Sequence, residues 1–332
     1  MPLDIVEVVR DMDRLARATW DRVMIGDIAG LKFREDSITD ELLFALMRKH
    51  PQLAVRRLNQ SEEKTAGADW EWWIGSWSLG WFRLKIQAKR VHGKKYRELD
   101  HRGDIDAGHE FQYQTLIAGC QGESTYPFHV FFNGWAQDRF RESFVSDHIH
   151  RCGPLDQELW GCAVMSSYSV VDLHLGSRGT EWTERSFVPR YMPASLPWSR
   201  LFTLACTNAV ADNLKAYRAH YATMSSEQIL DDLRMAAILL DGAGRGEISG
   251  VDGSGALNWA RQTLTSTPLV TRLPGYAHKT LAAHRYFLET GDFAEGNPNF
   301  LIGPEDALTG RLPDVLLLLD LDLDLDEIDR PR

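Results

Sequence analysis

The feature that most constrains the fold is the pattern of residues 80–91. Apolar and polar side chains alternate there with the period of two that a β-strand imposes on its faces. One set is Phe82, Leu84, Ile86 and Ala88, and the other is Trp81, Arg83, Lys85, Gln87 and Lys89. The pattern predicts a strand with one apolar face and one cationic, polar face.

The flanking sequence predicts helices and strands in alternation. Apolar residues recur at helical spacing from about residue 4 to 25. A second helix is expected from a capping box approximated by Ser37 and Asp40, and it should stop before Pro51. Further strands are predicted at 53–59 and 68–75, a helix at 108–120, and a strand at 127–133 that begins with Pro127.

The second half of the chain gives weaker signals. Strands are predicted at 159–166 and 168–175, and helices at about 208–222 and 226–240, the latter capped by Ser225 or Ser226. The glycine spacing in residues 241–255 does not match a phosphate-binding fingerprint and favours a flexible linker. Leu and Asp alternate over 319–326, which is typical either of an edge strand or of a solvated acidic tail.

Composition restricts the class of protein. The chain of 332 residues is 44% hydrophobic and 25% charged, as in ordinary globular proteins. Charged residues interrupt the N-terminal region and every long apolar window, so we expect neither a signal peptide nor a membrane span. The four cysteines form no C-x-x-C pair, which favours a reducing, cytoplasmic compartment. A net charge of −10 argues against broad coating of nucleic acid.

Three polar residues suggest a reaction centre. Asp69 begins one predicted strand, and Gln87 and Lys89 share a face of the next, so a hairpin would bring them together. A carboxylate and a neighbouring oxygen that hold Mg²⁺, with a lysine beside them, are the parts of a metal-assisted phosphodiesterase. The alternative interpretation is a solvated cationic strand face.

Positive charge concentrates beside these residues. Candidate nucleic-acid contacts are Arg83, Lys85, Arg90, Lys94, Lys95 and Gln112, of which Gln112 is equally well explained as part of a polar helix face. Five tryptophans fall between residues 70 and 81. Indoles can stack on bases, but we expect Trp72 and Trp73 to pack in the core, on opposite strand faces.

Five motifs together carry a resemblance to known proteins. They are TDELL at 39–43, EE…GADWEWW at 62–73, IQAKR at 86–90, QYQTLI at 112–117 and YPFHVFFN at 126–133. The order of acidic helix, Asp and (D/E/Q)-x-K resembles the PD-(D/E)XK nuclease superfamily. More closely, the motifs resemble an uncharacterised bacterial family with a domain of unknown function.

The resemblance implies a restriction-endonuclease-like α/β fold, with a mixed sheet of about four strands between helices. It implies hydrolysis of nucleic-acid phosphodiester bonds with Mg²⁺ or Mn²⁺, and a role in defence against foreign DNA. Asp69 matches the metal-binding acid, Gln87 occupies the second acidic position and Lys89 matches the catalytic lysine.

Gln87 departs from the majority pattern, because an amide offers a neutral oxygen where a carboxylate offers charge. Glu71, two residues after Asp69, is a candidate to help bind the metal. The acid expected on the preceding helix is ambiguous among Glu35, Asp40 and Glu41, and we favour Asp40 and Glu41 as metal ligands.

The sequence therefore predicts a Mg²⁺-dependent DNA endonuclease, with RNA as a substrate left open. Its expected parts are a nuclease core at 1–150, an accessory strand and helix region at 151–313 and an acidic tail at 314–332 that competes for the basic groove. The competing hypothesis is an inactive module of the same fold that binds nucleic acid or protein. A homodimer, and a regulatory partner bound through the C-terminal half, are also left open.

Overall fold

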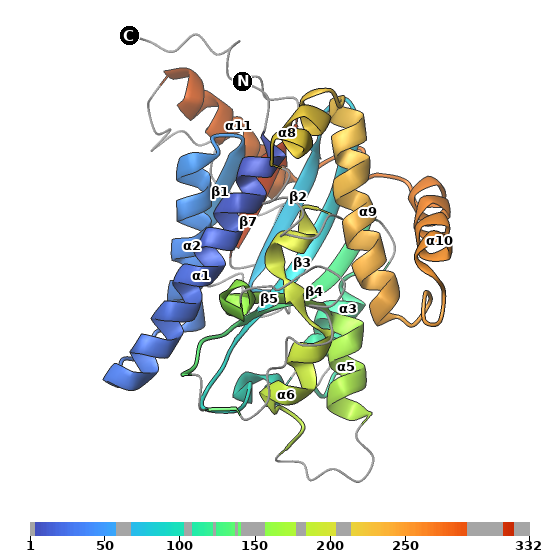
Figure 1. Cartoon of the computed structure of the whole chain (residues 1–332). Helices are drawn as coiled ribbons and strands as arrows, with labels where there is room; N and C mark the ends of the chain where they lie inside the picture. Colours follow the sequence, from blue (N-terminus) through green and yellow to red (C-terminus); the bar gives the residue numbers. More distant parts are fainter. Residues whose placement is uncertain are drawn as a thin grey trace.

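The computed structural model describes residues 4–57, 68–102, 108–121, 124–136, 139–140, 157–176, 184–203, 214–290 and 315–321. In these residues a mixed seven-stranded sheet forms the centre of the molecule, with helices around it (Figure 1). In spatial order the strands are β1 (Leu53–Arg57), β7 (Val315–Asp320), β2 (Trp70–Ser76), β3 (Gly80–Arg90), β4 (Thr125–Phe132), β5 (Cys162–Ser166) and β6 (Leu196–Pro197). The α/β class is confirmed, and the sheet has more strands than the four expected.

The helices account for most of the remaining described chain. The α-helices are α1 (Ile5–Ala29), α2 (Glu35–Lys49), α3 (Gln112–Ala118), α5 (Ser167–Leu175), α6 (Val188–Tyr191), α8 (Leu214–Ala222), α9 (Ser226–Gly244), α10 (Gly253–Ser266) and α11 (Gly275–Thr290). Short 3₁₀ helices are η2 (Arg97–Asp100), η3 (Gln157–Gly161), η5 (Met192–Ala194) and η6 (Trp198–Leu201). Among these described helices, none has the length and apolar character needed to cross a membrane.

Strands β2 and β3 form the predicted hairpin. They pair antiparallel, from Trp70 opposite Ile86 to Ser76 opposite Gly80. Gly80 has φ +96, which L side chains rarely adopt, and a Cβ there would meet the Cβ of Leu269 at 3.0 Å. The turn therefore requires glycine at this position.

Strand β4 lies next to β3 and runs parallel to it, so that Gln87 pairs with His129. The strand starts at Thr125, two residues before the predicted start at Pro127. Its pairing with β5 begins only at Phe128. Pro127 has no N–H to donate, but its nitrogen faces the side of β5, where pairing has not yet begun. The proline therefore removes no hydrogen bond from the sheet.

Strand β7 corrects the prediction for residues 319 and 320, whereas residues 322–326 of the same alternation lie outside the described residues. It is neither an edge strand nor a solvated tail, because it lies between β1 and β2, antiparallel to the first and parallel to the second. Leu317, Leu318 and Leu319 are buried, and buried Asp320 forms an ion pair with Arg285 of α11. The sheet thus combines β1 to β4, from the first 150 residues, with β5, β6 and β7 from the later part of the chain.

Three predicted elements differ from the structure. Residues 168–175 lie in helix α5 and are not a strand. The glycine-rich segment 241–255 is no flexible linker: α9 continues to Gly244, and α10 begins at Gly253 with Asp252 as its N-cap. Helix α2 begins at Glu35, before the expected cap at Ser37. The cap of α9 is confirmed as Ser225, which forms a capping box with Gln228.

The two faces of the β2–β3 hairpin pack differently. The apolar face enters a large cluster with residues of α1, α2 and α9, where Trp72 lies 4.7 Å from Phe202 between ring centroids. Trp73 and Trp81 point to the other face and pack in a smaller cluster with residues of α11. The predicted core packing of Trp72 and Trp73 on opposite faces is confirmed.

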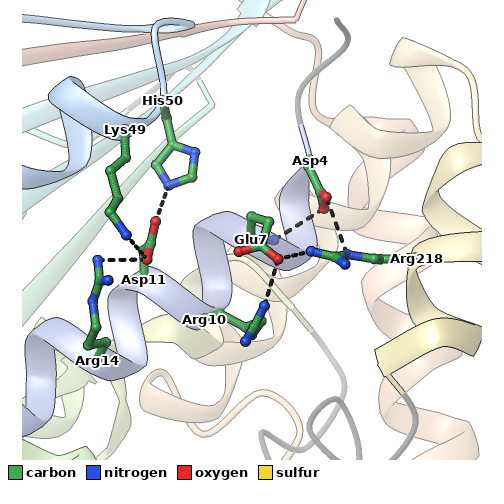
Figure 2. A network of polar contacts seen from close by, with 8 residues as sticks. All are labelled: Asp4, Glu7, Arg10, Asp11, Arg14, Lys49, His50 and Arg218. Carbon is green, nitrogen blue, oxygen red and sulfur yellow. Dashed lines mark hydrogen bonds and ion pairs between the residues drawn. The ribbon is translucent and has the colours of Figure 1, made fainter.

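A polar network fixes α1 against α2 and α8 (Figure 2). Buried Asp11 of α1 accepts a hydrogen bond from Lys49 at 3.0 Å and contacts His50 Nε2 at 2.9 Å. Nearer the start of α1, Arg218 of α8 forms ion pairs with Asp4 and Glu7. Because Lys49 is the last residue of α2 and His50 is its C-cap, these contacts join the C-terminal end of α2 to α1.

Candidate functional site

The hairpin places Asp69 beside the part of β3 that carries Gln87 and Lys89. Just before the pairing of Trp70 with Ile86, the Asp69 N–H donates a 2.8 Å hydrogen bond to the Ile86 carbonyl, which places Asp69 beside β3 at the point where β2 begins. The Asp69 carboxylate then accepts a hydrogen bond from the backbone N–H of Ala88. Lys89 is the next residue of β3, and its side chain is on the same face as that of Gln87.

Glu35 completes this arrangement from the first turn of α2. Its carboxylate accepts a hydrogen bond from the backbone N–H of Arg90. The N–H groups of Ala88 and Arg90 point to the same side of β3, where β2 has ended, and lie about 7 Å apart along the strand. At these two positions, which flank Lys89 in the sequence, a carboxylate accepts the backbone hydrogen bond that a neighbouring strand would otherwise accept.

Both carboxyl groups are half-buried, and this raises their pKa values. Burial raises the pKa of Glu35 to about 7, with the neighbouring Asp69 charge adding to the shift and Lys89 opposing it. Burial also raises the pKa of Asp69, against the effects of Lys89 and the Ala88 N–H. Lys89 is buried and donates a 3.3 Å hydrogen bond to Gln112 Oε1 on α3. The site thus holds two poorly solvated acids beside one lysine.

Gln87 is fully buried and belongs to a chain of hydrogen bonds. Its Oε1 lies 2.9 Å from Nε2 of His129, and Nδ1 of His129 lies 2.9 Å from Oγ of Ser167. Burial, together with the nearby charge of Lys89, holds the pKa of His129 well below its usual value. Sequence reasoning missed His129 and Ser167; the only signal was the position of His129 within the YPFHVFFN motif.

The helical acid near Asp69 is one of the three that the sequence left open, but not one of the two that were favoured. The structure places Glu35 beside Asp69, and not the favoured Asp40 and Glu41. Glu41 is exposed and paired with Arg22 of α1, while Asp40 is half-buried further along α2. The reason is the early start of α2, which puts Glu35 at the end of the helix that meets β3.

Glu71 does not join the candidate metal ligands. It is fully buried and accepts hydrogen bonds from Tyr276 at 2.8 Å and Trp73 at 3.2 Å. It also lies 3.5 Å from both Arg83 and Lys85. Glu71 therefore joins β2, β3 and α11 through these contacts.

The cationic residues of β3 are not an open surface for phosphate. Lys85 and Arg90 are buried, and Arg90 pairs with Asp27 at 2.9 Å. Arg83, besides its contact with Glu71, stacks 4.9 Å from the Trp73 ring. This corrects the expectation of a solvated or DNA-facing strand.

Two lysines beyond the end of β3 remain nearer the surface. Lys94 is exposed and lies 6.0 Å from the Phe140 ring, and half-buried Lys95 lies 4.9 Å from that of Phe187. Gln112 is half-buried at the site itself, through its bond with Lys89. Of the six predicted nucleic-acid contacts, these three stay candidates on grounds of accessibility.

The donor set can be compared with the needs of Mg²⁺. No three His, Cys, Asp or Glu side chains in the described part of the chain are grouped so as to hold a metal ion. Mg²⁺, however, usually takes only one or two protein carboxylates and completes its shell with water and substrate phosphate. Glu35 and Asp69 provide two carboxylates whose charged forms are poorly compensated, and Gln87, on the same face of β3 as Lys89, carries a carbonyl oxygen that lies 2.9 Å from His129 Nε2. These residues fit Mg²⁺ bound together with a phosphate substrate.

Comparison with known sequences and structures gives one match. A family model described as a family of unknown function (DUF6615) matches residues 8–308. Neither a curated protein nor a solved structure matches the chain. The matched region contains Glu35, Asp69, Gln87 and Lys89, and it covers most of the chain. The protein therefore belongs to the DUF6615 family.

Proposed function

We propose that this protein is a Mg²⁺-dependent endonuclease that hydrolyses DNA phosphodiester bonds. The observation that carries the proposal is the placement of the Glu35 and Asp69 carboxylates on the free edge of β3, on either side of Lys89. Glu35 at the start of α2, Asp69 just before β2, and Gln87 and Lys89 of β3 thus contribute two acids, an amide oxygen and a lysine. This is the donor set that metal-assisted phosphodiester hydrolysis requires.

Each residue has a role in this reaction. Glu35 and Asp69 hold the cation, and Gln87 offers a neutral oxygen to it. When bound, Mg²⁺ polarises the scissile phosphate and lowers the pKa of water in its shell. Lys89 stabilises the negative charge that develops on the phosphate, or orients the attacking water, and Gln112 holds the lysine amine in place.

The test is cleavage of plasmid, single-stranded DNA and RNA by the full chain, with Mg²⁺, Mn²⁺ or EDTA. We expect cleavage of DNA only with a divalent cation, and losses of about a hundredfold or more in Asp69→Asn, Glu35→Gln and Lys89→Met. Glu41→Gln is the matched control, because Glu41 lies on the same helix but is exposed and paired with Arg22. Its activity should equal that of the wild type.

Two results would contradict the proposal. One is cleavage that persists in EDTA, and the other is cleavage that the three substitutions leave unchanged. Preference for RNA would keep the chemistry but correct the substrate.

A second candidate function is an inactive module that binds nucleic acid or protein. The observation that favours it is the neutral amide at position 87, whose oxygen already accepts a hydrogen bond from His129. This function predicts binding without turnover and no Mn²⁺ binding that depends on Asp69. Calorimetric titration with Mn²⁺ separates the two, since heat that disappears in Asp69→Asn supports the nuclease.

A further inference from the structure

An amide at the position of a metal ligand raises a problem of orientation. A carboxylate offers the same kind of oxygen at both ends, whereas a glutamine offers an oxygen at one end and an NH₂ donor at the other. Only the oxygen end can bind a cation. The side chain of Gln87 must therefore be held with its oxygen in the productive place.

The contacts of His129 meet this requirement. Strand β4 is in parallel register with β3, and His129 lies directly beside Gln87. The Gln87 oxygen can only accept, so His129 Nε2, at 2.9 Å, carries the proton and donates it. An amide oxygen has two lone pairs, and this bond uses one of them.

The imidazole is itself fixed from the other side. With Nε2 as donor, Nδ1 accepts a 2.9 Å hydrogen bond from the hydroxyl of Ser167, at the start of α5. The ring also stacks on Phe131 at 6.1 Å between centroids. Gln87, His129 and Ser167 are all fully buried, so water does not compete for these bonds.

We propose that His129, held by Ser167, is a positioning residue that selects the carbonyl end of Gln87 for the candidate metal site. The inference deepens the proposed function and rests on it. It assigns His129 no contact with substrate. Its effect reaches the site through Gln87 alone, as partners behind a metal ligand commonly act.

This role makes a prediction that a merely structural role does not. If His129 matters because residue 87 is an amide, it should matter less when residue 87 is a carboxylate. The experiment is therefore a double-mutant cycle in the full chain with Gln87→Glu and His129→Phe, the phenylalanine keeping an aromatic ring beside Phe131. The readout is the Mn²⁺ dissociation constant, measured by calorimetry without DNA.

We expect His129→Phe to weaken Mn²⁺ binding by about 10–100-fold in the wild-type background. The same change in the Gln87→Glu background should cost much less. His129→Gln retains a side-chain donor and should recover part of the affinity, and Ser167→Ala should cause a smaller loss than His129→Phe. These two gentler variants keep the test valid if His129→Phe does not fold.

The control is His50→Gln, since His50 is a buried histidine that contacts Asp11 away from the site. It should leave Mn²⁺ affinity unchanged. Equal losses in both backgrounds, or no loss from any change at His129 or Ser167, would overturn the positioning role and leave the nuclease proposal standing. A wild-type protein that binds no Mn²⁺ would overturn both.

Discussion

At the scale of single residues, Glu35 links the candidate site to the stability of the fold. Its pKa is about 7 in the folded protein, above the ordinary value of 4.5, because of burial. The folded state thus keeps this proton to a higher pH than the unfolded chain does. Glu35 therefore contributes stability that is fully present below pH 4.5 and is lost as the pH rises through about 7.

Glu35→Gln should remove this dependence. In EDTA, we expect the variant to gain stability relative to the wild type between pH 5 and pH 8, because it has no charge to bury at the higher pH. Urea denaturation at both pH values measures the difference, with Glu41→Gln as the control. A wild type and a variant with parallel pH profiles would contradict the raised pKa.

Substitution of Glu71 is expected to lower the stability of the fold, in contrast to Glu35→Gln. Because Glu71 is fully buried and bound by Tyr276, Arg83 and Lys85, Glu71→Ala leaves buried Lys85 and half-buried Arg83 without their carboxylate. We expect a loss of about 3–5 kcal/mol in the free energy of unfolding, measured in urea. A variant of unchanged stability that had lost Mn²⁺ binding would instead restore Glu71 as a metal ligand.

At the scale of elements, the hairpin of β2 and β3 decides whether Asp69 meets Gln87. Gly80→Ala forces a side chain into a backbone of φ +96 and against Leu269. We expect a loss of about 1–3 kcal/mol in the free energy of unfolding. Gly253→Ala, in the first turn of α10 with open space around it, is the control and should be near neutral. Similar losses in both variants would contradict the strained turn.

The elements that could be predicted are those with local signals. Period-two alternation and a short connection were sufficient for β2 and β3, and therefore for Asp69, Gln87 and Lys89. The helix acid was misplaced because α2 begins after Arg34, which makes no side-chain cap, and not at Ser37. Residues 168–175 form a short apolar run, whose periodicity does not separate a buried strand from a buried helix.

Other features depend on contacts that no local pattern contains. The contact of His129 with Gln87 follows from the parallel pairing of β3 with β4, which joins residues 42 positions apart. The burial of Lys85 and Arg90 follows from Glu71 and Asp27, whose positions are set by packing. The alternation of cationic and apolar residues in the sequence therefore predicted the strand, but not that Lys85 and Arg90 are buried.

At the scale of the whole molecule, β7 changes the expectation for the acidic end of the chain. The sequence predicts an acidic tail that competes for a basic groove, but deletion of the residues after Pro313 would remove a strand from the interior of the sheet. We expect this truncation to abolish cooperative unfolding, because β1 and β2 lose their common neighbour. Circular dichroism during heating measures it, and a wild-type melting transition would contradict the interior position.

A truncation after Leu321 is the matched control. It removes residues 322–332, with their acids, and keeps β7 whole. It should retain the wild-type transition, and comparison of its DNA affinity at low salt with that of the full chain tests competition by the acidic end separately from the fold.

The position of β7 also has a consequence for the order of synthesis. Val315 pairs with Trp70, so the ribosome must add more than two hundred residues after β2 before the neighbour of β2 exists. Until then, β1 and β2 each expose an unpaired edge, and β2, which follows Asp69, has only β3 as a neighbour. The nascent chain therefore completes its sheet late, and the arrangement around Asp69 becomes fully supported only once translation has passed Asp320.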